Sequence, residues 1–270
     1  MKITFVGGGN MGSALISGLI RNGENRNNIS VIEPDAERRA QMGAEYGISV
    51  FENLDFLDCD LILLAVKPQQ LHAVASVLAD KLSTQVVVSI AAGILTSDLS
   101  KWLKGYGRIV RVMPNTPAQV MKGISALYAM PRVSVEDKKM AEEVLSSVGS
   151  TIWLSDEEKM DAFTALCGSG PAYVFYFLEA MIEAGTEMGF NANDAKKMAL
   201  ETFSGSLALV SESQDEPAIL RRKVTSKGGT TERALLEMEN SHVKAHVVRA
   251  IRAAEARSRE LGIELGKASC

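Results

Sequence analysis

Two observations predict an α/β fold in which a doubly wound sheet in the first half of the chain is followed by an all-helical second half. In the first half, short runs rich in β-branched residues alternate with helical stretches, the order that gives a parallel sheet covered by helices on both faces. From about Asp156 such runs disappear, and stretches rich in alanine, methionine, leucine and glutamate follow. This change predicts two domains, residues 1–157 and 158–270.

The strands expected in the first half are short, and the helices between them are amphipathic. Leu61–Val66 and Val86–Ile90 are unbroken apolar runs, typical of strands buried on both faces of a parallel sheet. Asn10–Asn22 carries Leu15 and Leu19 at helical spacing. The expected strands are Ile3–Val6, Ile29–Ile32, Leu61–Val66, Val86–Ile90, Arg108–Val112 and Ile124–Tyr128, and the expected helices are Asn10–Asn22 and Ala36–Tyr46.

Three long helices are expected in the second half, over Tyr173–Met188, Asn193–Ser211 and Ser241–Leu261. Asn193-Asp194 supplies an N-cap for the second of them. Pro171 falls in the first turn of the first helix, where its missing N–H costs nothing.

Composition and charge exclude several classes of protein. The 270 residues are 46% hydrophobic and 23% charged, the balance of a globular protein. A net charge of −4 gives no electrostatic argument for nucleic acid or an anionic membrane as partner. No signal peptide is recognisable at the start, and the unbroken apolar runs are too short to span a membrane. Cys59, Cys167 and Cys270 are an odd number without CxxC spacing, which favours a reducing cytoplasm and no metal site.

A glycine-rich turn, Gly7-Gly8-Gly9-Asn10-Met11-Gly12, follows the first strand directly. In such a G-x-G-x-x-G, glycine serves the tight turn, the approach of backbone to a pyrophosphate, and the packing of helix on strand. The following helix directs free N–H groups and its positive dipole end at the phosphates. Since a strand precedes the motif and a helix follows it, we expect a nicotinamide dinucleotide site in a Rossmann-like domain rather than a bare turn. The residues expected to bind it here are Gly7, Gly9, Asn10, Met11 and Gly12.

Glu33 ends the second expected strand, about 20 residues after the last glycine. A carboxylate there accepts hydrogen bonds from the adenosine ribose and repels a 2′-phosphate, which favours NADH over NADPH. Arg38 and Arg39 offer the alternative, because they can hold a 2′-phosphate. They are equally well explained as solvated charges on a helix.

Two more loops fall at the carboxyl ends of expected strands, where ligands bind in open α/β sheets. They are Ala65-Val66-Lys67-Pro68 and Ser89-Ile90-Ala91-Ala92-Gly93. Pro68 stops its strand, and the small residues Ala91, Ala92 and Gly93 allow a flat nicotinamide ring to approach the backbone. Both loops are therefore expected to bind the cofactor, although Lys67 can equally be a surface charge.

Taken together, six motifs closely resemble the pyrroline-5-carboxylate reductase family, which catalyses the last step of proline biosynthesis. The resemblance covers essentially the whole chain. The motifs are, in order, Phe5–Gly12, Ala65–Pro68, Ser89–Gly93, Arg111-Val112-Met113-Pro114-Asn115-Thr116-Pro117, Gly168-Ser169-Gly170-Pro171-Ala172-Tyr173 and Val224-Thr225-Ser226-Lys227-Gly228-Gly229-Thr230-Thr231.

The resemblance implies reduction of 1-pyrroline-5-carboxylate to L-proline by hydride transfer from NADH or NADPH. It further implies a Rossmann-like domain and a helical dimerisation domain that interlocks with a second subunit, with several dimers forming a ring. The substrate would lie at the dimer interface, between the nicotinamide and the Ser226–Thr231 loop. Asn115 would lie close to the nicotinamide.

The Ser226–Thr231 loop is the proposed anchor for the substrate carboxylate. Successive backbone N–H groups before a helix form an anion-binding nest, and the Thr231 hydroxyl can add a further donor. The alternative is an ordinary glycine loop with a threonine cap. The residues assigned to the substrate are Ser226, Gly228, Gly229, Thr230 and Thr231. The family usually has proline where this chain has Lys227, and the cation can either attract the anionic substrate or point to solvent.

Ser169 and Thr231 are the two expected catalytic residues. Ser169 can donate a hydrogen bond to the nicotinamide carboxamide or to the substrate, or it can merely cap a helix. A small cyclic imine is partly protonated in neutral water and then accepts hydride readily. Orientation therefore matters more than a strong general acid.

Three other functions fit parts of the pattern. A β-hydroxyacid dehydrogenase would need a lysine on the helix that opens the second domain, but Gly168–Leu178 contains none. A non-catalytic NAD(P) sensor would not need a second anion site. A reductase of another cyclic imine stays possible, since one methylene is worth only about 1–3 kcal/mol of discrimination.

Overall fold

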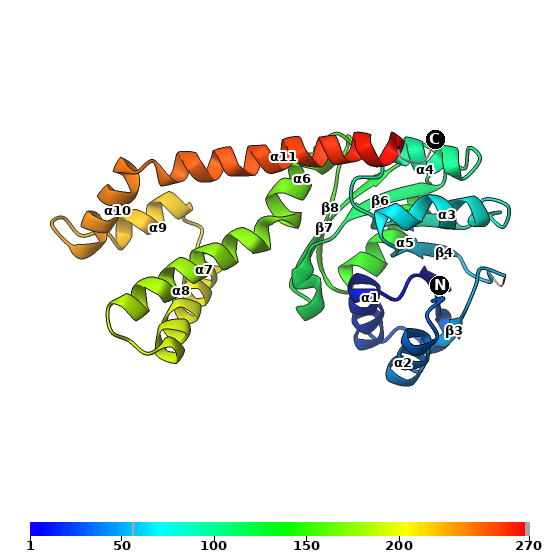
Figure 1. The fold of residues 1–270 in the computed structure, drawn as a ribbon, viewed down its shortest axis with the longest axis horizontal. Coiled ribbons are helices and arrows are strands. Elements are labelled where there is room, and N and C mark those ends of the chain that lie inside the picture. Colours follow the sequence, from blue (N-terminus) through cyan, green and yellow to red (C-terminus); the bar gives the residue numbers. More distant parts are fainter. Residues whose placement is uncertain (56, 268–270) are drawn as a thin grey trace. The chain divides into compact units, whose positions relative to one another are not determined.

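The computed structural model describes residues 1–55 and 57–267 and has the expected α/β fold with a helical second half (Figure 1). The chain forms two compact units. One comprises Met1–Ser169 and the C-terminal segment from Ala254, and the other comprises Gly170–Ala253. Cys270 lies outside the described residues.

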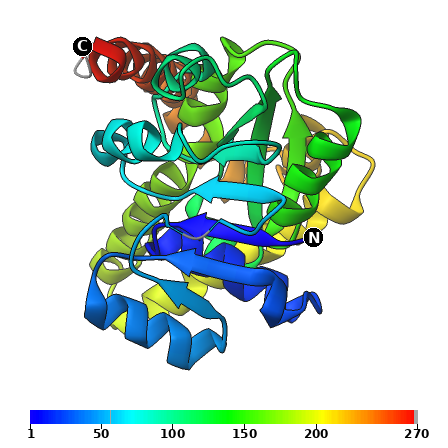
Figure 2. The ribbon, with the colours of Figure 1, turned by 90° about the vertical axis from the view of Figure 1, so that its right-hand side faces the viewer.

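The first unit is built on an eight-stranded sheet in the order β3-β2-β1-β4-β5-β6-β7-β8 (Figure 2). Neighbouring strands are parallel except β6 and β7, which pair antiparallel with Val112 opposite Leu127. The link between these two is too short for a parallel crossover, which needs a dozen or more residues. The strands are β1 Ile3–Val6, β2 Ile29–Ile32, β3 Ser49–Phe51, β4 Leu61–Leu64, β5 Val86–Ser89, β6 Ile109–Met113, β7 Gly123–Ala129 and β8 Gly149–Trp153.

All six expected strands are present, and the structure adds β3 and β8 at the two edges of the sheet. β3 has only three residues, and β8 alternates between half-buried and exposed positions. Neither edge strand therefore carries the unbroken apolar run that identifies the central strands.

Helices cover both faces of the sheet and form two apolar layers. Leu15, Met42 and Val144 belong to the layer beneath α1, α2 and α5, whereas Leu71 and Leu99 belong to the layer beneath α3 and α4. The helices are α1 Asn10–Arg21, α2 Ala36–Tyr46, α3 Pro68–Leu78, α4 Thr96–Trp102 and α5 Val135–Ser146, with short 3₁₀ turns η1 Arg26–Asn28 and η2 Thr116–Val120.

The boundary between the compact units differs from the division expected at residue 157. α6, Lys159–Phe163, lies in the first unit, and the end of α11, Val243–Lys267, packs there too. Ser258 donates to Asp161 at 2.7 Å, and Leu265 packs on the α3–α4 layer. The point in the sequence where strand-like segments stop therefore marks the change in secondary structure. It does not mark the boundary between the two compact units.

The helical half differs from expectation at two helix starts, those of α8 and α11. α8 is capped by Asn191, whose side chain accepts from the amide of Asp194, rather than by Asn193. The first long helix opens where it was expected, since α7 begins at Gly170 with Pro171 in its first turn; α6 and a π-helical turn, Thr164–Gly168, come just before it. The remaining helices are α7 Gly170–Glu187, α8 Ala192–Glu212, α9 Pro217–Lys223, α10 Thr230–Asn240 and α11, which starts at Val243 instead of Ser241.

Large apolar side chains are exposed along α7 and α8. Phe175 and Tyr176 are 58% and 72% exposed, and Met198 and Leu207 continue the pattern. By length and composition alone, Lys159–Glu187 is the one helix among the described residues that could cross a membrane. Polar residues interrupt it, so the unbroken apolar runs of the sequence do not reveal it.

A buried ion pair joins the start of β6 to the amino end of α5. The Asp137 side chain is 1% exposed and accepts from Arg108 at 2.7 and 3.1 Å. It also completes a capping box with Ser134. Burial alone would raise the pKa of the Asp137 carboxyl, but hydrogen bonds from Arg108 and Ser134 outweigh burial and lower that pKa below its usual value.

Replacing Asp137 with asparagine should lower the free energy of unfolding at pH 7 by about 2 kcal/mol, since it leaves a half-buried guanidinium without its charge partner. Because the pKa of the Asp137 carboxyl is lower in the folded than in the unfolded protein, its ionised form stabilises the fold at pH values above the unfolded-state pKa of about 4. This stabilisation is lost as the pH falls through the folded-state pKa. The difference between variant and parent should therefore shrink in acid, as measured by denaturant unfolding at several pH values. Asp80→Asn, which breaks the exposed pair with Lys104, is the control. Equal losses in the two variants would refute the assignment.

Candidate cofactor and substrate sites

The glycine-rich turn between β1 and α1 uses its glycines in different ways. Gly7 has φ +99°, and a Cβ built on it would lie 2.8 Å from the Ala65 carbonyl oxygen. A Cβ on Gly12 would lie 2.9 Å from the Gly7 carbonyl oxygen, so both glycines are required by the fold itself. Gly9 has φ −67°, and a Cβ there would meet nothing within 4 Å. At Gly9 the backbone is therefore open to a ligand.

A cavity of about 730 Å³ opens in front of this turn, at the carboxyl ends of β1, β2, β3 and β4. It brings together six of the residues expected to bind the cofactor, namely Gly7, Gly9, Glu33, Ala65, Val66 and Lys67. Asn10, Met11 and Gly12 begin α1, and Pro68 begins α3, without lining the cavity. This is the crevice in which open α/β sheets bind nucleotides.

Several lining residues were not expected from the sequence. Glu52 and Asn53 follow β3, the short edge strand, and Gln69 and Gln70 lie in the first turn of α3. The rule that ligands bind beyond the carboxyl ends of strands would have identified the first two, had β3 been recognised.

Glu33 lines the cavity and is held by the turn itself. Its carboxylate accepts from the amide of Gly8 at 2.8 Å and from that of Asp35 at 3.1 Å. The Gly8 carbonyl in turn accepts from Arg38 Nε at 2.9 Å. Both polar groups of Gly8 are thus fixed by side chains of opposite charge.

The two arginines that could hold a 2′-phosphate have other partners. Arg38 also donates to the Ser13 hydroxyl at 2.7 Å, and Arg39 donates to the carbonyls of Glu33 and Pro34 at 2.7 and 2.9 Å. Neither lines the cavity. To grip a phosphate, these side chains would have to give up their present hydrogen bonds.

The loop after β5 does not join this cavity. Ala91 is buried, Ala92 is exposed, and Gly93 has φ +78°. A Cβ on Gly93 would lie 2.9 Å from Leu265 Cδ1 and 3.7 Å from the Gly262 nitrogen. Gly93 therefore makes room for α11, and its expected role in admitting a nicotinamide ring stays a prediction.

Asn115, also expected near the nicotinamide, is 9% exposed and has one hydrogen-bond partner at each end of its carboxamide. Its Oδ1 accepts from the Ile124 amide at 2.9 Å, and its Nδ2 donates to the Cys167 carbonyl at 3.2 Å. Ser169 directly follows the π-helical turn, and its amide donates to the Thr164 carbonyl at 2.8 Å. Pro171 lies in the first turn of α7, as expected, and this widened turn directly precedes that helix.

The second predicted site lies in the helical unit, at the start of α10. Gly228 has φ +73°, and its amide donates to Glu232 Oε2 at 2.6 Å, while the Gly229 amide donates to the Ser226 carbonyl at 3.0 Å. Two of the amides expected to form the nest are thus used within the loop. Thr230 and Thr231 occupy the first turn of α10, where amides have no partner inside the helix. Among the residues predicted to bind the substrate, Thr230 and Thr231 thus keep amides without an intrahelical partner, and Lys227 of the same loop is exposed.

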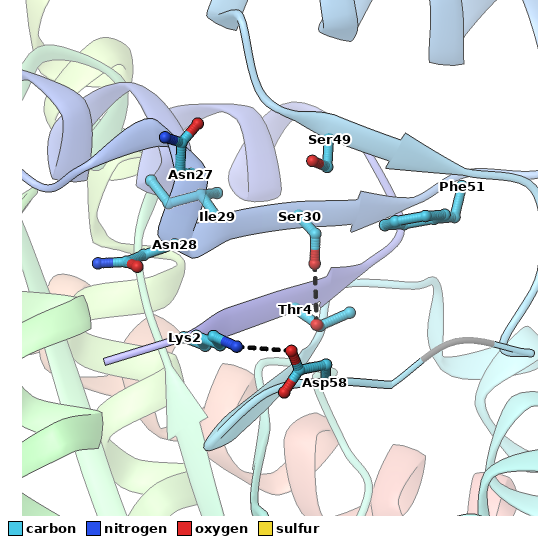
Figure 3. Close-up of a pocket in the computed structure, with 9 residues that line it drawn as sticks. All are labelled: Lys2, Thr4, Asn27, Asn28, Ile29, Ser30, Ser49, Phe51 and Asp58. Carbon is cyan, nitrogen blue, oxygen red and sulfur yellow. Dashed lines mark hydrogen bonds and ion pairs between the residues drawn. The ribbon is translucent and has the colours of Figure 1, made fainter.

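A smaller hollow lies near the amino ends of β1 and β2, away from the carboxyl-end cavity (Figure 3). Its volume is about 130 Å³, and four of its polar side chains pair with one another. Lys2 pairs with Asp58 at 2.5 Å, and the Thr4 and Ser30 hydroxyls share a hydrogen bond of 2.9 Å. We assign it no ligand.

The thiols of the described residues give no nucleophile. Cys59 and Cys167 are both free, and burial raises the pKa of each thiol. Both therefore stay protonated at neutral pH.

Two known families match this chain, one over the α/β half and one over the helical half. Residues 157–261 match a family described as pyrroline-5-carboxylate reductase dimerisation. Residues 2–93 match a family described as NADP oxidoreductase, coenzyme F420-dependent. The exposed apolar side chains of α7 and α8 thus fall within the dimerisation match.

Individual relatives match over nearly their full length. A pyrroline-5-carboxylate reductase from Pseudomonas aeruginosa is 43% identical, with 98% of each chain covered. The structure of a pyrroline-5-carboxylate reductase from Coxiella burnetii superposes with a TM-score of 0.90 at 37% identity, covering 96% of this chain and 98% of its own. That of a Plasmodium falciparum pyrroline carboxylate reductase with NADP bound gives 0.86 at 30% identity, covering 97% and 98%.

Proposed function

Because the chain belongs to the pyrroline-5-carboxylate reductase family, we propose that it reduces 1-pyrroline-5-carboxylate to L-proline with a hydride from a reduced nicotinamide cofactor. The observation that carries this proposal is the open backbone at Gly9, at the head of α1 and beside the carboxyl-end cavity. Every other glycine of the turn is explained by internal contacts or by its φ angle, but Gly9 is explained only by a ligand.

The residues of the first unit fit a dinucleotide. The amides that begin α1 have no partner inside the helix, and together with the dipole of that helix they favour a pyrophosphate. The cavity of about 730 Å³ is large enough for part of such a molecule. When bound, the reduced nicotinamide supplies the hydride. Ala65, Val66 and Lys67 would line the same crevice.

We propose NADH as the preferred cofactor. Glu33 lines the cavity with a carboxylate that repels a 2′-phosphate, and Arg38 and Arg39 have other hydrogen-bond partners. The alternative, NADPH, is favoured by the Plasmodium falciparum relative, which binds NADP. In that case an arginine must leave its present partners.

Exchanging Glu33 for serine should raise the ratio of kcat/KM with NADPH to that with NADH by about tenfold, the effect of relieving roughly 1–2 kcal/mol of charge repulsion. Glu33→Gln is the matched variant, because it keeps an acceptor for the Gly8 amide and removes only the charge. Steady-state kinetics with each cofactor measure the ratio. An unchanged ratio in both variants would show that Glu33 does not face the ribose.

The substrate carboxylate is proposed to bind at the first turn of α10. The amides of Thr230 and Thr231 and the Thr231 hydroxyl supply donors there, and the positive end of the helix dipole adds to them. The bond between Gly228 and Glu232 fixes the loop that leads into this turn. Lys227 adds a positive charge close by, which favours an anionic substrate.

In the proposed reaction the main task of the protein is to place the imine and the nicotinamide correctly. A protonated cyclic imine already carries the charge that hydride neutralises, so its carbon needs no strong acid beside it. Ser169 is the proposed donor that orients the imine or the carboxamide. Holding both reactants at contact distance means that their loss of translational and rotational entropy occurs on binding and no longer adds to the barrier of the reaction step.

A spectrophotometric assay tests the proposed function. Steady loss of absorbance at the reduced-nicotinamide band with 1-pyrroline-5-carboxylate, and formation of an equal amount of proline, is the expected result. Cofactor binding without turnover would instead indicate a sensor. Oxidation of a 3-hydroxy acid with oxidised cofactor would indicate a hydroxyacid dehydrogenase, and a larger cyclic imine in the same assay tests the size of the ring pocket.

The chain contains the dimerisation region of its family, and we propose that dimers form through α7 and α8 and assemble further into a ring. The exposed side chains of Phe175, Tyr176 and Leu207 supply the apolar area that a subunit interface needs. This interpretation assigns the apolar face of Lys159–Glu187 to protein contacts instead of lipid. Two free thiols support a reducing compartment, so we place the enzyme in the cytoplasm.

A further inference from the structure

The helical stretch from α6 to α7 contains one backbone position that cannot bond in the usual way. Pro171 has no N–H, so the carbonyl four residues earlier, that of Cys167, lacks its α-helical donor. The stretch widens into a π-helical turn at this point, where the Ser169 amide bonds to the carbonyl of Thr164, five residues back. Such turns are rare in helices and often occur at functional sites.

A side chain from the connection between β6 and β7 takes the place of the missing donor. Asn115 Nδ2 donates to the Cys167 carbonyl at 3.2 Å. Its Oδ1 accepts from the Ile124 amide of β7 at 2.9 Å, which fixes which end of the carboxamide faces the helix. The side chain is buried, with 9% exposed, so an unmet carbonyl or amide there would be costly.

Met113, the last residue of β6, makes a second contact with the π-helical turn. A Cβ built on Gly168 would lie 2.7 Å from the Met113 methyl carbon, so the end of β6 packs directly against the turn. The β6–β7 connection thus touches the turn through Met113 and bonds to it through Asn115.

We infer that Asn115 is a positioning residue, which holds the π-helical turn open and so sets the place of Ser169, instead of binding the cofactor itself. Each end of its carboxamide already has a protein partner and the side chain is buried, which leaves little of it for a nicotinamide. The kinetic part of this inference rests on the proposed function, because Ser169 matters only if the turn borders the reacting groups.

Hydrogen exchange of the full-length protein tests the contact without any assay of activity. In Asn115→Ala, amides in a peptide covering residues 164–170 should exchange about tenfold faster than in the parent, as expected when a buried hydrogen bond is lost. Asn115→Asp keeps an acceptor for the Ile124 amide but removes the donor to the Cys167 carbonyl, so it should speed exchange as Asn115→Ala does. If Asn115→Asp does not fold, the alanine variant decides alone.

Pro171→Ala provides the internal control, because it returns an N–H that can reach the Cys167 carbonyl. In the Pro171→Ala background, Asn115→Ala should accelerate exchange of the same peptide by less than about threefold, since the carbonyl keeps a partner. Equal acceleration in both backgrounds, or none in either, would overturn the inference.

Kinetics complete the test. Asn115→Ala should lower kcat for the imine by about tenfold or more, the effect of a misplaced reacting group, and leave the Kd for reduced cofactor within about twofold of the parent value. Faster exchange with unchanged kcat would overturn the positioning role. A parent protein that fails to reduce the imine would instead refute the proposed function, and the exchange comparison would still decide whether Asn115 holds the turn.

Discussion

Replacing Gly9 with valine should weaken the binding of reduced cofactor by about 100-fold or more and leave the fold of the α/β unit intact. A Cβ on Gly9 meets no protein atom within 4 Å, and the φ of −67° and ψ of 179° suit any L-residue. The added side chain would project where the pyrophosphate must approach the backbone. Overpacking of a closely fitted contact costs about 1–3 kcal/mol, and two extra methyl groups place valine at the upper end.

Titration of the intrinsic or cofactor fluorescence gives the Kd, and thermal unfolding reports on the fold. Gly205→Val is the matched control, since a Cβ at Gly205 likewise meets nothing within 4 Å, and Gly205 lies in α8 and does not line the cavity. Its cofactor Kd should stay unchanged. If Gly9→Val binds cofactor as the parent does, the dinucleotide does not lie at the head of α1.

Replacing Thr231 with alanine should raise the KM for the imine by about 10- to 100-fold, because hydrogen bonds to a charged group contribute about 1.5–3 kcal/mol. The KM for the cofactor should change far less, since the hydroxyl is assigned to the substrate carboxylate alone. Steady-state kinetics with each reactant varied in turn separate the two constants.

Two variants bracket this result. Thr231→Ser keeps the hydroxyl and should restore most of the affinity. Thr202→Ala removes a hydroxyl that bonds to the Met198 carbonyl within α8, and it should leave both constants unchanged. Equal rises for imine and cofactor, or no rise in either, would refute the carboxylate site at α10.

The central strands and the nucleotide-binding turn could be predicted because each has a signature in the local sequence. β4 and β5 are unbroken apolar runs, Gly7 has a positive φ, and Gly12 is held to glycine by the carbonyl of Gly7, five residues earlier. The six motifs that resemble pyrroline-5-carboxylate reductases likewise led to the correct family.

The remaining features depend on contacts between residues far apart in the sequence. Gly93 is small because α11, about 170 residues later, packs on it. Pro171 lies in the first turn of a helix as expected, but the π-helical turn before it was not foreseen, since the donor that meets the Cys167 carbonyl there is Asn115, on another element. The Ser226–Thr231 loop was expected to offer all its amides, but Glu232 and Ser226 occupy two of them. These contacts leave no periodic pattern in the sequence from which they could be predicted.

A crystal structure of the protein with nicotinamide cofactor and L-proline bound together tests the central claim most directly. We predict the pyrophosphate against Gly9 at the amino end of α1 and the proline carboxylate on the Thr230 and Thr231 amides, with the ring carbon beside the nicotinamide. A carboxylate bound by any other group, or a pyrophosphate outside the glycine-rich turn, would contradict it.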